Sequence, residues 1–300
     1  MSEKIGEEIQ VLDNGFVSLV DFFGSDSEIV RAARVSYAQG TKIVSEDEEL
    51  IRYLMRYEHY SPFAMAQVKF HIRLPIFVHN QWVRHDRLHW NLISARYSIM
   101  PKEKWLSKSS WRAPSSSNKQ AGEKLIDSSL TDVWRDLDYI PTTMNPDTPT
   151  QAYLDELQTN SYHSSESAYQ RLIRTGVCRE QARSVLPMGQ YTEAFVTANL
   201  GDWMLFLRKR LDSHAQKEIQ EYAGVIFAIL NDIFPVSMKA FVDYQQNARI
   251  FSRCEMNILL EVLNSGVKIF DLSSDDRVKL LEKHGLKSKR ERIEFFSKLK

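Results

Sequence analysis

The stretch Gln81-Trp82-Val83-Arg84-His85-Asp86-Arg87-Leu88-His89-Trp90-Asn91-Leu92-Ile93-Ser94-Ala95-Arg96-Tyr97-Ser98 holds three arginines, two histidines and two tryptophans within eighteen residues. An arginine side chain offers a planar fork of donors that suits a phosphate or the edge of a pyrimidine. Tryptophan and tyrosine offer flat faces on which a ring can stack. The stretch therefore predicts a site for a nucleotide.

The residues before this stretch predict how it is held. From Gln67 to Leu74, apolar and polar residues alternate strictly, which is typical of a half-buried antiparallel strand. Pro75 then suits the first turn of a helix. A helix that continued to His85 would place Gln81, Arg84 and His85 on one side at spacings of three and four residues.

Other segments predict strands and helices around this centre. Residues 15–23 alternate as a strand, and Ser25 with Glu28 forms a capping box for the next helix. Ser45 and Glu48 form a second capping box, whose helix would end near Tyr57 and deliver His59. Loops are expected at 107–119 and 141–150, around a helix near 123–137. Further segments predict a helix from Tyr153, a strand at 194–199, a long helix at 212–234 stopped by Pro235, and a helical, basic tail at 251–300.

Composition sets the broad class. Three hundred residues with 43% hydrophobic content suffice for one large domain or for a domain with an appendage, and the plausible boundary lies near residues 244–247. Lys plus Arg and Asp plus Glu number 39 each, so no global charge favours nucleic acid. Cys178 and Cys254 give no disulfide framework, and no apolar run approaches the roughly 20 residues of a membrane span. We expect a cytoplasmic protein without membrane contact.

Four motifs in order resemble those of the flavin-dependent thymidylate synthase family. The first is Arg84-His85 followed by Ser94-Ala95-Arg96-Tyr97. The others are His59-Tyr60-Ser61-Pro62-Phe63, then Arg183-Ser184-Val185-Leu186-Pro187, then Arg210-Leu211-Asp212-Ser213-His214-Ala215-Gln216-Lys217-Glu218-Ile219. The resemblance covers about residues 10–244, which predicts a synthase-like domain over 1–246 and a helical basic extension over 247–300.

The resemblance implies an α/β (α+β) fold with a central antiparallel sheet flanked by helices, assembled as a homotetramer. It implies C5 methylation of a uridine nucleotide, dUMP to dTMP, with FAD as cofactor, 5,10-methylenetetrahydrofolate as carbon donor and NADPH as reductant. It assigns catalytic roles to Arg210, Ser94 and His59. It assigns nucleotide contacts to Gln81, Arg84, Ser94, Ala95, Arg96, Arg183 and Arg210. It assigns the flavin site to His59, Ser61, Arg84, His85, Asp86, Arg87, Asn199 and His214.

This chain departs from the family pattern on the flavin side. Asp86 stands where the family has arginine, and Ala64, His89, Leu92 and Leu205 also differ. Two alternatives therefore stay open: an enzyme acting on another pyrimidine nucleotide, UMP or dCMP, and a non-catalytic nucleotide-binding protein without flavin. A third hypothesis makes the basic tail the functional part.

Some residues also have plain structural explanations. Arg84 and Arg96 could form ordinary surface ion pairs, and His59 could complement a helix end. His85 and His89 have a spacing compatible with a metal, yet no third ligand follows, so no metal is predicted.

Overall fold

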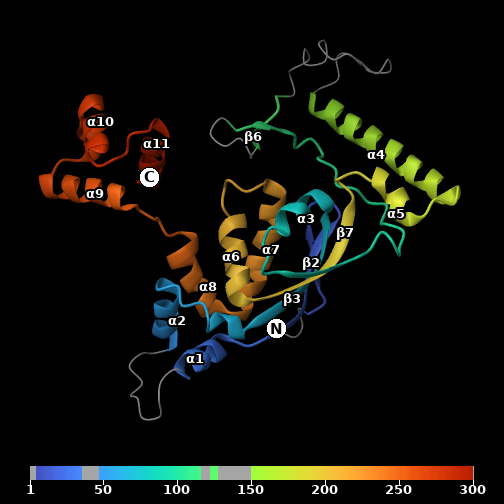
Figure 1. Cartoon of the computed structure of the whole chain (residues 1–300), viewed down its shortest axis with the longest axis horizontal. Coiled ribbons are helices and arrows are strands. Elements are labelled where there is room, and N and C mark those ends of the chain that lie inside the picture. The colour runs from blue at the N-terminus through green and yellow to red at the C-terminus, as the bar shows by residue number, and fades with distance from the viewer. Residues whose placement is uncertain (1–4, 36–46, 116–121, 128–149, 300) are drawn as a thin grey trace. The chain divides into compact units, whose positions relative to one another are not determined.

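The computed structural model describes residues 5–35, 47–115, 122–127 and 150–299. The chain divides into two compact units, Met1–Gln246 and Asn247–Lys300 (Figure 1). The described residues of the first unit form a five-stranded sheet, a separate two-stranded sheet and helices, and those of the second unit form helices.

The described part of the first unit contains a five-stranded sheet in the order β1-β2-β3-β7-β4, with every neighbouring pair antiparallel. Its strands are β1 (Glu8–Val11), β2 (Gly15–Phe23), β3 (Gln67–Pro75), β4 (His89–Leu92) and β7 (Tyr191–Asn199). The three strands expected from alternation are confirmed as β2, β3 and β7. The apolar residues of β3, including Val68, Phe70 and Ile72, are fully buried, because that face of the sheet is covered by helices.

The first unit also contains helices. They are α1 (Asp26–Arg34), α2 (Asp47–Arg56), α3 (Ile76–Trp82), α4 (Thr150–Arg174), α5 (Arg179–Ala182), α6 (Leu200–Arg210), α7 (Lys217–Ile233) and α8 (Pro235–Phe241). Of these, α3, α6 and α7 contact strands of the sheet. In Figure 1, α6 and α7 stand on one side of the sheet, and α4 with α5 extends on the other. Half of the capping box expected at Ser25 and Glu28 is confirmed, since the Ser25 side chain accepts from the Glu28 amide, while the Glu28 carboxylate pairs with Arg31 at 2.8 Å. Pro75 precedes α3, as the sequence predicts.

An aromatic cluster joins α3 to α6 at the centre of the core. The rings of Trp82 and Phe206 stack with centroids 4.6 Å apart, and Trp203 meets Phe70 of β3 edge to face at 5.0 Å. All four side chains are fully buried. Burial of side chains this large gives the α3–α6 contact much of its stability, and it brings the end of α3 beside the end of α6.

Three sequence predictions of elements are wrong in detail. The helix α3 ends at Trp82 rather than continuing to His85, because the chain must turn to join the sheet edge from His89, where β4 pairs with β7. The long helix begins at Lys217 instead of 212, because residues 212–215 form a turn closed by the Ala215 amide and the Asp212 carbonyl. Part of the helix expected near 123–137 is a strand, β6 (Gly122–Leu125), paired with β5 (Arg112–Pro114); residues 128–137 lie outside the described residues.

The second unit contains α9 (Arg253–Ser265), α10 (Ser274–Lys283) and α11 (Lys289–Lys298), as the helical pattern of the tail predicts. Its own core includes Ile258, Leu281 and Phe295. Full capping boxes start α9 at Ser252 and α11 at Ser288. Over both units, the helices in the described residues are too short or too polar to cross a membrane.

Candidate active site

Arg210, the last residue of α6, is held against the turn that follows α3. Its Nε donates to His85 Nε2 at 3.0 Å, and its Nη2 donates to the main-chain oxygen of Gln81 at 3.0 Å. Gln81 and His85 lie close together in the sequence, but Arg210 is more than a hundred positions away. The packing of α3 against α6 brings the three residues into contact. Within the part of the chain that the structure describes, no other hydrogen bond uses the remaining N–H groups of this guanidinium, which a ligand could therefore occupy.

His85 serves as a neutral acceptor in this contact. Burial, with the positive charges of Arg210 and Lys209, lowers the pKa of His85 to about 4, while Asp86 acts in the opposite direction. Burial also lowers the pKa of Arg210. At neutral pH the imidazole is therefore uncharged, and its Nε2 lone pair receives the Arg210 donor.

A further set of amides continues from Gln81. The Gln81 Nε2 donates to Gln216 Oε1, and Gln216 Nε2 donates to Glu218 Oε2 at 2.6 Å. The other oxygen of Glu218 accepts from Arg112 Nη2 at 2.5 Å. Gln81 is thus tied to the first turn of α7 and to β5.

A second group of predicted residues surrounds the turn at Ser94. The Ser94 hydroxyl accepts from the Arg96 amide at 3.3 Å, and Arg179 donates to the Tyr97 carbonyl at 2.8 Å. Arg183 Nε donates to the Glu180 carbonyl at 3.3 Å, and Arg96 lies 3.9 Å from the Glu180 carboxylate. Because Arg96 is 53% exposed, its ion pair is weak and its guanidinium is free to meet an anion.

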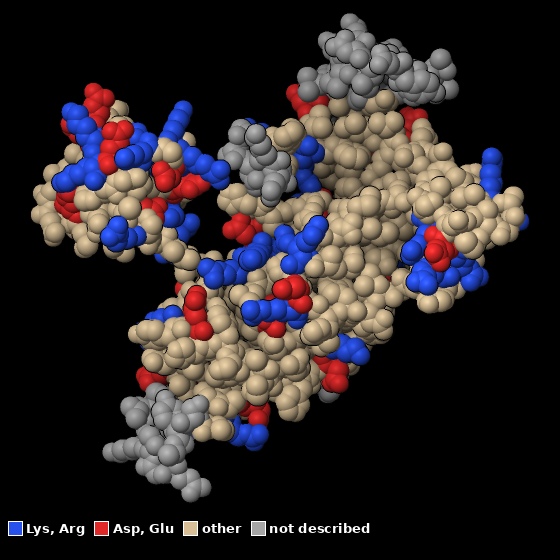
Figure 2. Space-filling view, in the orientation of Figure 1, with Lys and Arg blue, Asp and Glu red and all other residues tan. Residues whose placement is uncertain are grey.

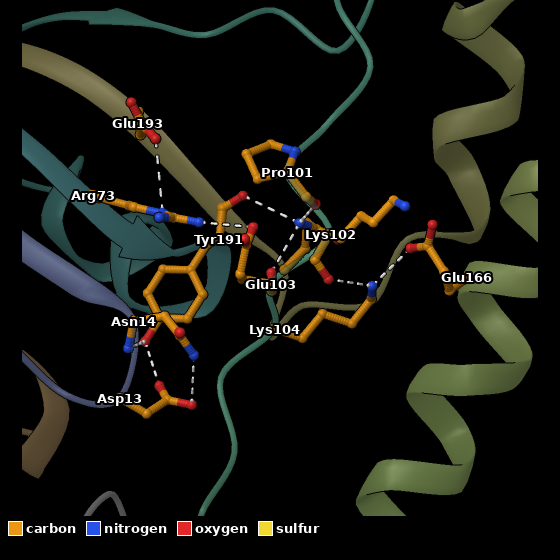
Figure 3. Close-up of polar contacts among 11 residues, drawn as sticks. Asp13, Asn14, Arg73, Pro101, Lys102, Glu103, Lys104, Glu166, Tyr191 and Glu193 are labelled. Carbon is orange, nitrogen blue, oxygen red and sulfur yellow. Dashed lines mark hydrogen bonds and ion pairs between the residues drawn. The ribbon is translucent and has the colours of Figure 1, made fainter.

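The segment after this turn is anchored to the sheet and to α4 (Figure 3). Arg73 of β3 contacts the carboxylates of Glu103 at 2.8 Å and Glu193 at 3.7 Å. Lys104 pairs with Glu166 of α4 at 2.7 Å, and Tyr191 donates to Asp13 at 2.6 Å. The contacts of Glu103 with β3 and of Lys104 with α4 hold this segment in place and so limit the positions that the Ser94 turn can take.

A third group lies at the start of α6. The Asn199 side chain caps this helix by accepting from the Asp202 amide at 2.9 Å, and Arg87 pairs with the Asp202 carboxylate at 3.3 Å. Arg87 is 67% exposed, which leaves it free to change partners. Figure 2 shows basic side chains gathered over this part of the first unit, with acidic ones among them.

His59 and Ser61 line a cavity of about 640 Å³ between α1, α2 and the segment that follows α2. The chain leaves α2 through Glu58, whose φ of 56° lies in the left-handed region and turns His59 away from the helix. The His59 ring meets that of Tyr53 edge to face at 5.9 Å. The cavity is lined by Ala32, Ala33, Leu50, Tyr53, Leu54, Glu58, His59, Tyr60, Ser61, Pro62 and Met65.

The structure brings some predicted residues together and leaves others apart. Arg210, His85 and Gln81 form one group, and Ser94, Arg96 and Arg183 form another; among the described residues no hydrogen bond or ion pair joins the two.

The remaining predicted residues have simpler environments. Arg84 and Asp86 are exposed in the turn after α3, and Ala95 is buried within the Ser94 turn. The ring of His214 contacts the Asp212 carboxylate at 2.8 Å.

The sequence prediction missed Arg179, Glu180 and Arg112, and it gave no role to Gln216 or Glu218. Gln216 and Glu218 belong to the motif at residues 210–219, so the sequence offered a signal for them. Arg112 had no such signal, because its partner Glu218 is 106 positions away.

The chain is thus an α/β protein with a five-stranded antiparallel sheet and two separate groups of residues that contain arginine, one around Arg210 and one around Arg96 and Arg183. Residues 18–236 match the family described as thymidylate synthase complementing protein, Thy1. The chain belongs to this family, which is that of the flavin-dependent thymidylate synthases.

Relatives and solved structures agree with this assignment. The chain is 39% identical over 257 residues to a flavin-dependent thymidylate synthase of Wolbachia pipientis, covering 86% of this chain and 84% of that protein. It is 41% identical over 266 residues to one of Thermus thermophilus, covering 89% and 90%. A UMP/dUMP methylase, PolB, from Streptomyces cacaoi, crystallised with 5-bromo-UMP, is 29% identical with a TM-score of 0.62, covering 80% of this chain and 99% of that one.

Proposed function

We propose that the protein is a methyltransferase of nucleotide biosynthesis that converts dUMP to dTMP. In this proposal 5,10-methylenetetrahydrofolate supplies the carbon, NADPH is the reductant and FAD is the bound cofactor. The observation that carries the proposal is Arg210, whose guanidinium is fixed by His85 and by the Gln81 carbonyl, and whose other donors meet no acceptor among the described residues. Such a group binds the carbonyl edge of a pyrimidine.

Arg210 has a chemical as well as a binding role in this proposal. Methylation at C5 requires electron density to build on the uracil ring and its carbonyl oxygens. A fixed positive charge at that edge stabilises the build-up, and a partly buried site strengthens the effect because little water competes. His85 keeps the guanidinium aimed without adding a second charge, since its low pKa leaves it neutral.

The nucleotide phosphate is assigned to the turn at Ser94. Arg96 and Arg183, with the Ser94 hydroxyl, offer donors at an exposed surface, and Arg84 adds another exposed guanidinium after α3. Arginines bind phosphate with paired hydrogen bonds. Ser94 acts here as a ligand for phosphate rather than as a nucleophile, because no base contacts its hydroxyl among the described residues.

The residues present fit FAD. The cavity at His59 and Ser61 has aromatic and apolar walls with a few polar groups, as a planar ring system requires. Arg87 and Asn199 lie at the start of α6, where Arg87 can reach a diphosphate, and His214 and His85 are candidates for further contacts. When bound, the flavin supplies the hydride that completes the methyl group. The negative charge of Asp86 is offset by two nearby positive charges. Arg87 follows Asp86 in the sequence, and Lys209 opposes the effect of Asp86 on the pKa of His85.

We infer that the site is completed in a homotetramer. In the described ranges no hydrogen bond or ion pair joins the Arg210 group to the Ser94 group of one chain, and apolar side chains near the Ser94 turn are exposed, including Tyr97 at 73% and Met188. On the open face of the sheet, His71 and the exposed Phe195 stack at 4.7 Å. Exposed apolar surface of this kind marks contacts between proteins. Light scattering should give four times the 34.9 kDa chain mass; a monomer would contradict the inference.

The remaining expectations also enter as proposals. We infer that residues 1–246 carry the activity, that residues 247–300 are an accessory helical extension, and that the protein works in the cytoplasm without contact to membranes or nucleic acid.

The deciding experiment combines spectroscopy and product analysis. Purified protein should show a flavin absorption band that shifts when dUMP is added, and it should form dTMP with methylenetetrahydrofolate and NADPH. The matched substrates UMP and dCMP test the alternative, which the likeness to a UMP/dUMP methylase favours for UMP. Binding of dUMP by colourless protein without turnover would support the non-catalytic alternative and contradict the proposal.

A further inference from the structure

Glu218 is a buried carboxylate at the end of the chain of hydrogen bonds that begins at Gln81. It lies in the first turn of α7 and is 3% exposed. One of its oxygens accepts from Arg112 and the other from Gln216. The ion pair neutralises the buried charge, and each carboxylate oxygen accepts one hydrogen bond.

An ionised carboxylate can only accept, and this determines the direction of the whole chain. Gln216 must turn its NH₂ group toward Glu218, so it turns its carbonyl oxygen toward Gln81. Gln81 must then use its own NH₂ group to reach Gln216. Its carbonyl oxygen consequently points elsewhere, and none of the hydrogen bonds among the described residues is donated to it.

We propose that Glu218 is a positioning residue, acting through Gln216, which makes Gln81 present its carbonyl oxygen to a hydrogen-bond donor of the bound nucleotide. The donor is a ring N–H or a sugar hydroxyl, because a phosphate has no comparable donor. This inference rests on the proposed function, since it takes the nucleotide to lie beside Arg210. Arg210 is independent of the amide direction, because it contacts the main-chain oxygen of Gln81.

The variant Glu218→Gln reverses the chain instead of breaking it. Arg112 is a permanent cation and demands an acceptor, so the new amide oxygen faces Arg112 and its NH₂ faces Gln216. Gln216 then flips, and Gln81 flips in turn, presenting a donor where the nucleotide also has a donor. We expect the dissociation constant for dUMP to rise about tenfold, as loss of one well-placed hydrogen bond implies.

Removal of Arg112 should reverse that loss. In R112M/E218Q the glutamine oxygen is free to accept from Gln216, so the original direction returns and the dUMP dissociation constant falls to within about threefold of the parent. R112M alone keeps the carboxylate and the direction, so it should bind dUMP nearly as well as the parent while unfolding at a lower temperature. The exposed Glu221→Gln on the same helix is the matched control.

Calorimetric titration with dUMP, with 3-methyl-dUMP and with the 3′-deoxy nucleotide distinguishes the two donors. The analogue that lacks the donor bound by Gln81 should bind the parent protein more weakly than dUMP does. In E218Q that analogue and dUMP should bind with similar dissociation constants. An unchanged dUMP dissociation constant in E218Q, or a loss that R112M fails to restore, would overturn the proposal and leave Glu218 a structural residue. If the parent protein itself fails to bind dUMP, it is the proposed function that fails.

Discussion

At the scale of single residues, Arg210 makes the contacts on which the proposed nucleotide site depends. It is the only one of the predicted residues whose side chain contacts both His85 and Gln81 among the described residues. Lysine in its place has a single point of attachment and cannot hold both contacts while facing a ligand.

Replacement of Arg210 by lysine should therefore reduce nucleotide affinity. We expect R210K to bind dUMP about 10- to 100-fold more weakly, with an unfolding midpoint close to the parent because the cation is retained near the surface. Calorimetric titration measures the first and thermal unfolding the second. Arg290→Lys, an exposed change in the second unit, is the control, and equal affinity in R210K and R290K would contradict the role of Arg210.

His85 predicts a dependence of stability on pH. Its pKa is lowered from 6.5 to about 4 in the folded protein, so the unfolded chain binds the proton more tightly. Stability is therefore fully present above pH 6.5 and decreases as the pH falls toward 4. We expect His85→Gln, which keeps an acceptor for Arg210, to remove about 2 kcal/mol of this decrease, after allowing for solvent screening. Urea unfolding of both proteins from pH 4 to 7.5 measures it; parallel curves would refute the assignment.

At the scale of elements, the contact between α3 and α6 determines the site. Both helices end beside it, and the Trp82–Phe206 stack holds them together. The sequence predicts α3 correctly from Pro75 but not its end, because no local signal opposes a helix through His85. The ladder between β4 and β7, formed with a strand about a hundred residues later, draws the chain out of the helix.

Truncation of the stacked ring should destabilise the first unit. Phe206→Ala leaves a cavity in a fully buried cluster, and we expect a loss of about 3–4 kcal/mol of unfolding free energy. Phe23→Ala, at a side chain that is 68% exposed, should change it by less than about 0.5 kcal/mol. Chemical denaturation compares the two, and similar losses would show that the stack is not central.

At the scale of the whole molecule, the two units have separate cores. The family match ends at residue 236, within the first unit, so the second unit lies outside it. A helical unit of this size has a small core and correspondingly low stability. Its unfolding should therefore leave the first unit intact.

Phe295→Ala tests that independence. The side chain is fully buried in the second core, and its removal should unfold residues 247–300 without changing dUMP affinity. Hydrogen exchange should then rise throughout 247–300 and stay constant in 1–246. Lost nucleotide binding in this variant would instead favour a functional role for the tail, which is the third hypothesis from the sequence.

The sequence by itself determined the strands β2, β3 and β7, the starts of α1 and α3 and the family, because alternation, capping residues and ordered motifs are local signals. It also named Arg210, Gln81 and Ser94. Only the tertiary structure decided which of these residues meet: that Arg210 bonds His85, that Ser94 and Arg96 belong to a separate group, and that Arg112 neutralises Glu218. Such pairings depend on how α3, α6, α7 and β5 pack, and packing joins residues whose separation along the chain carries no signal of their contact.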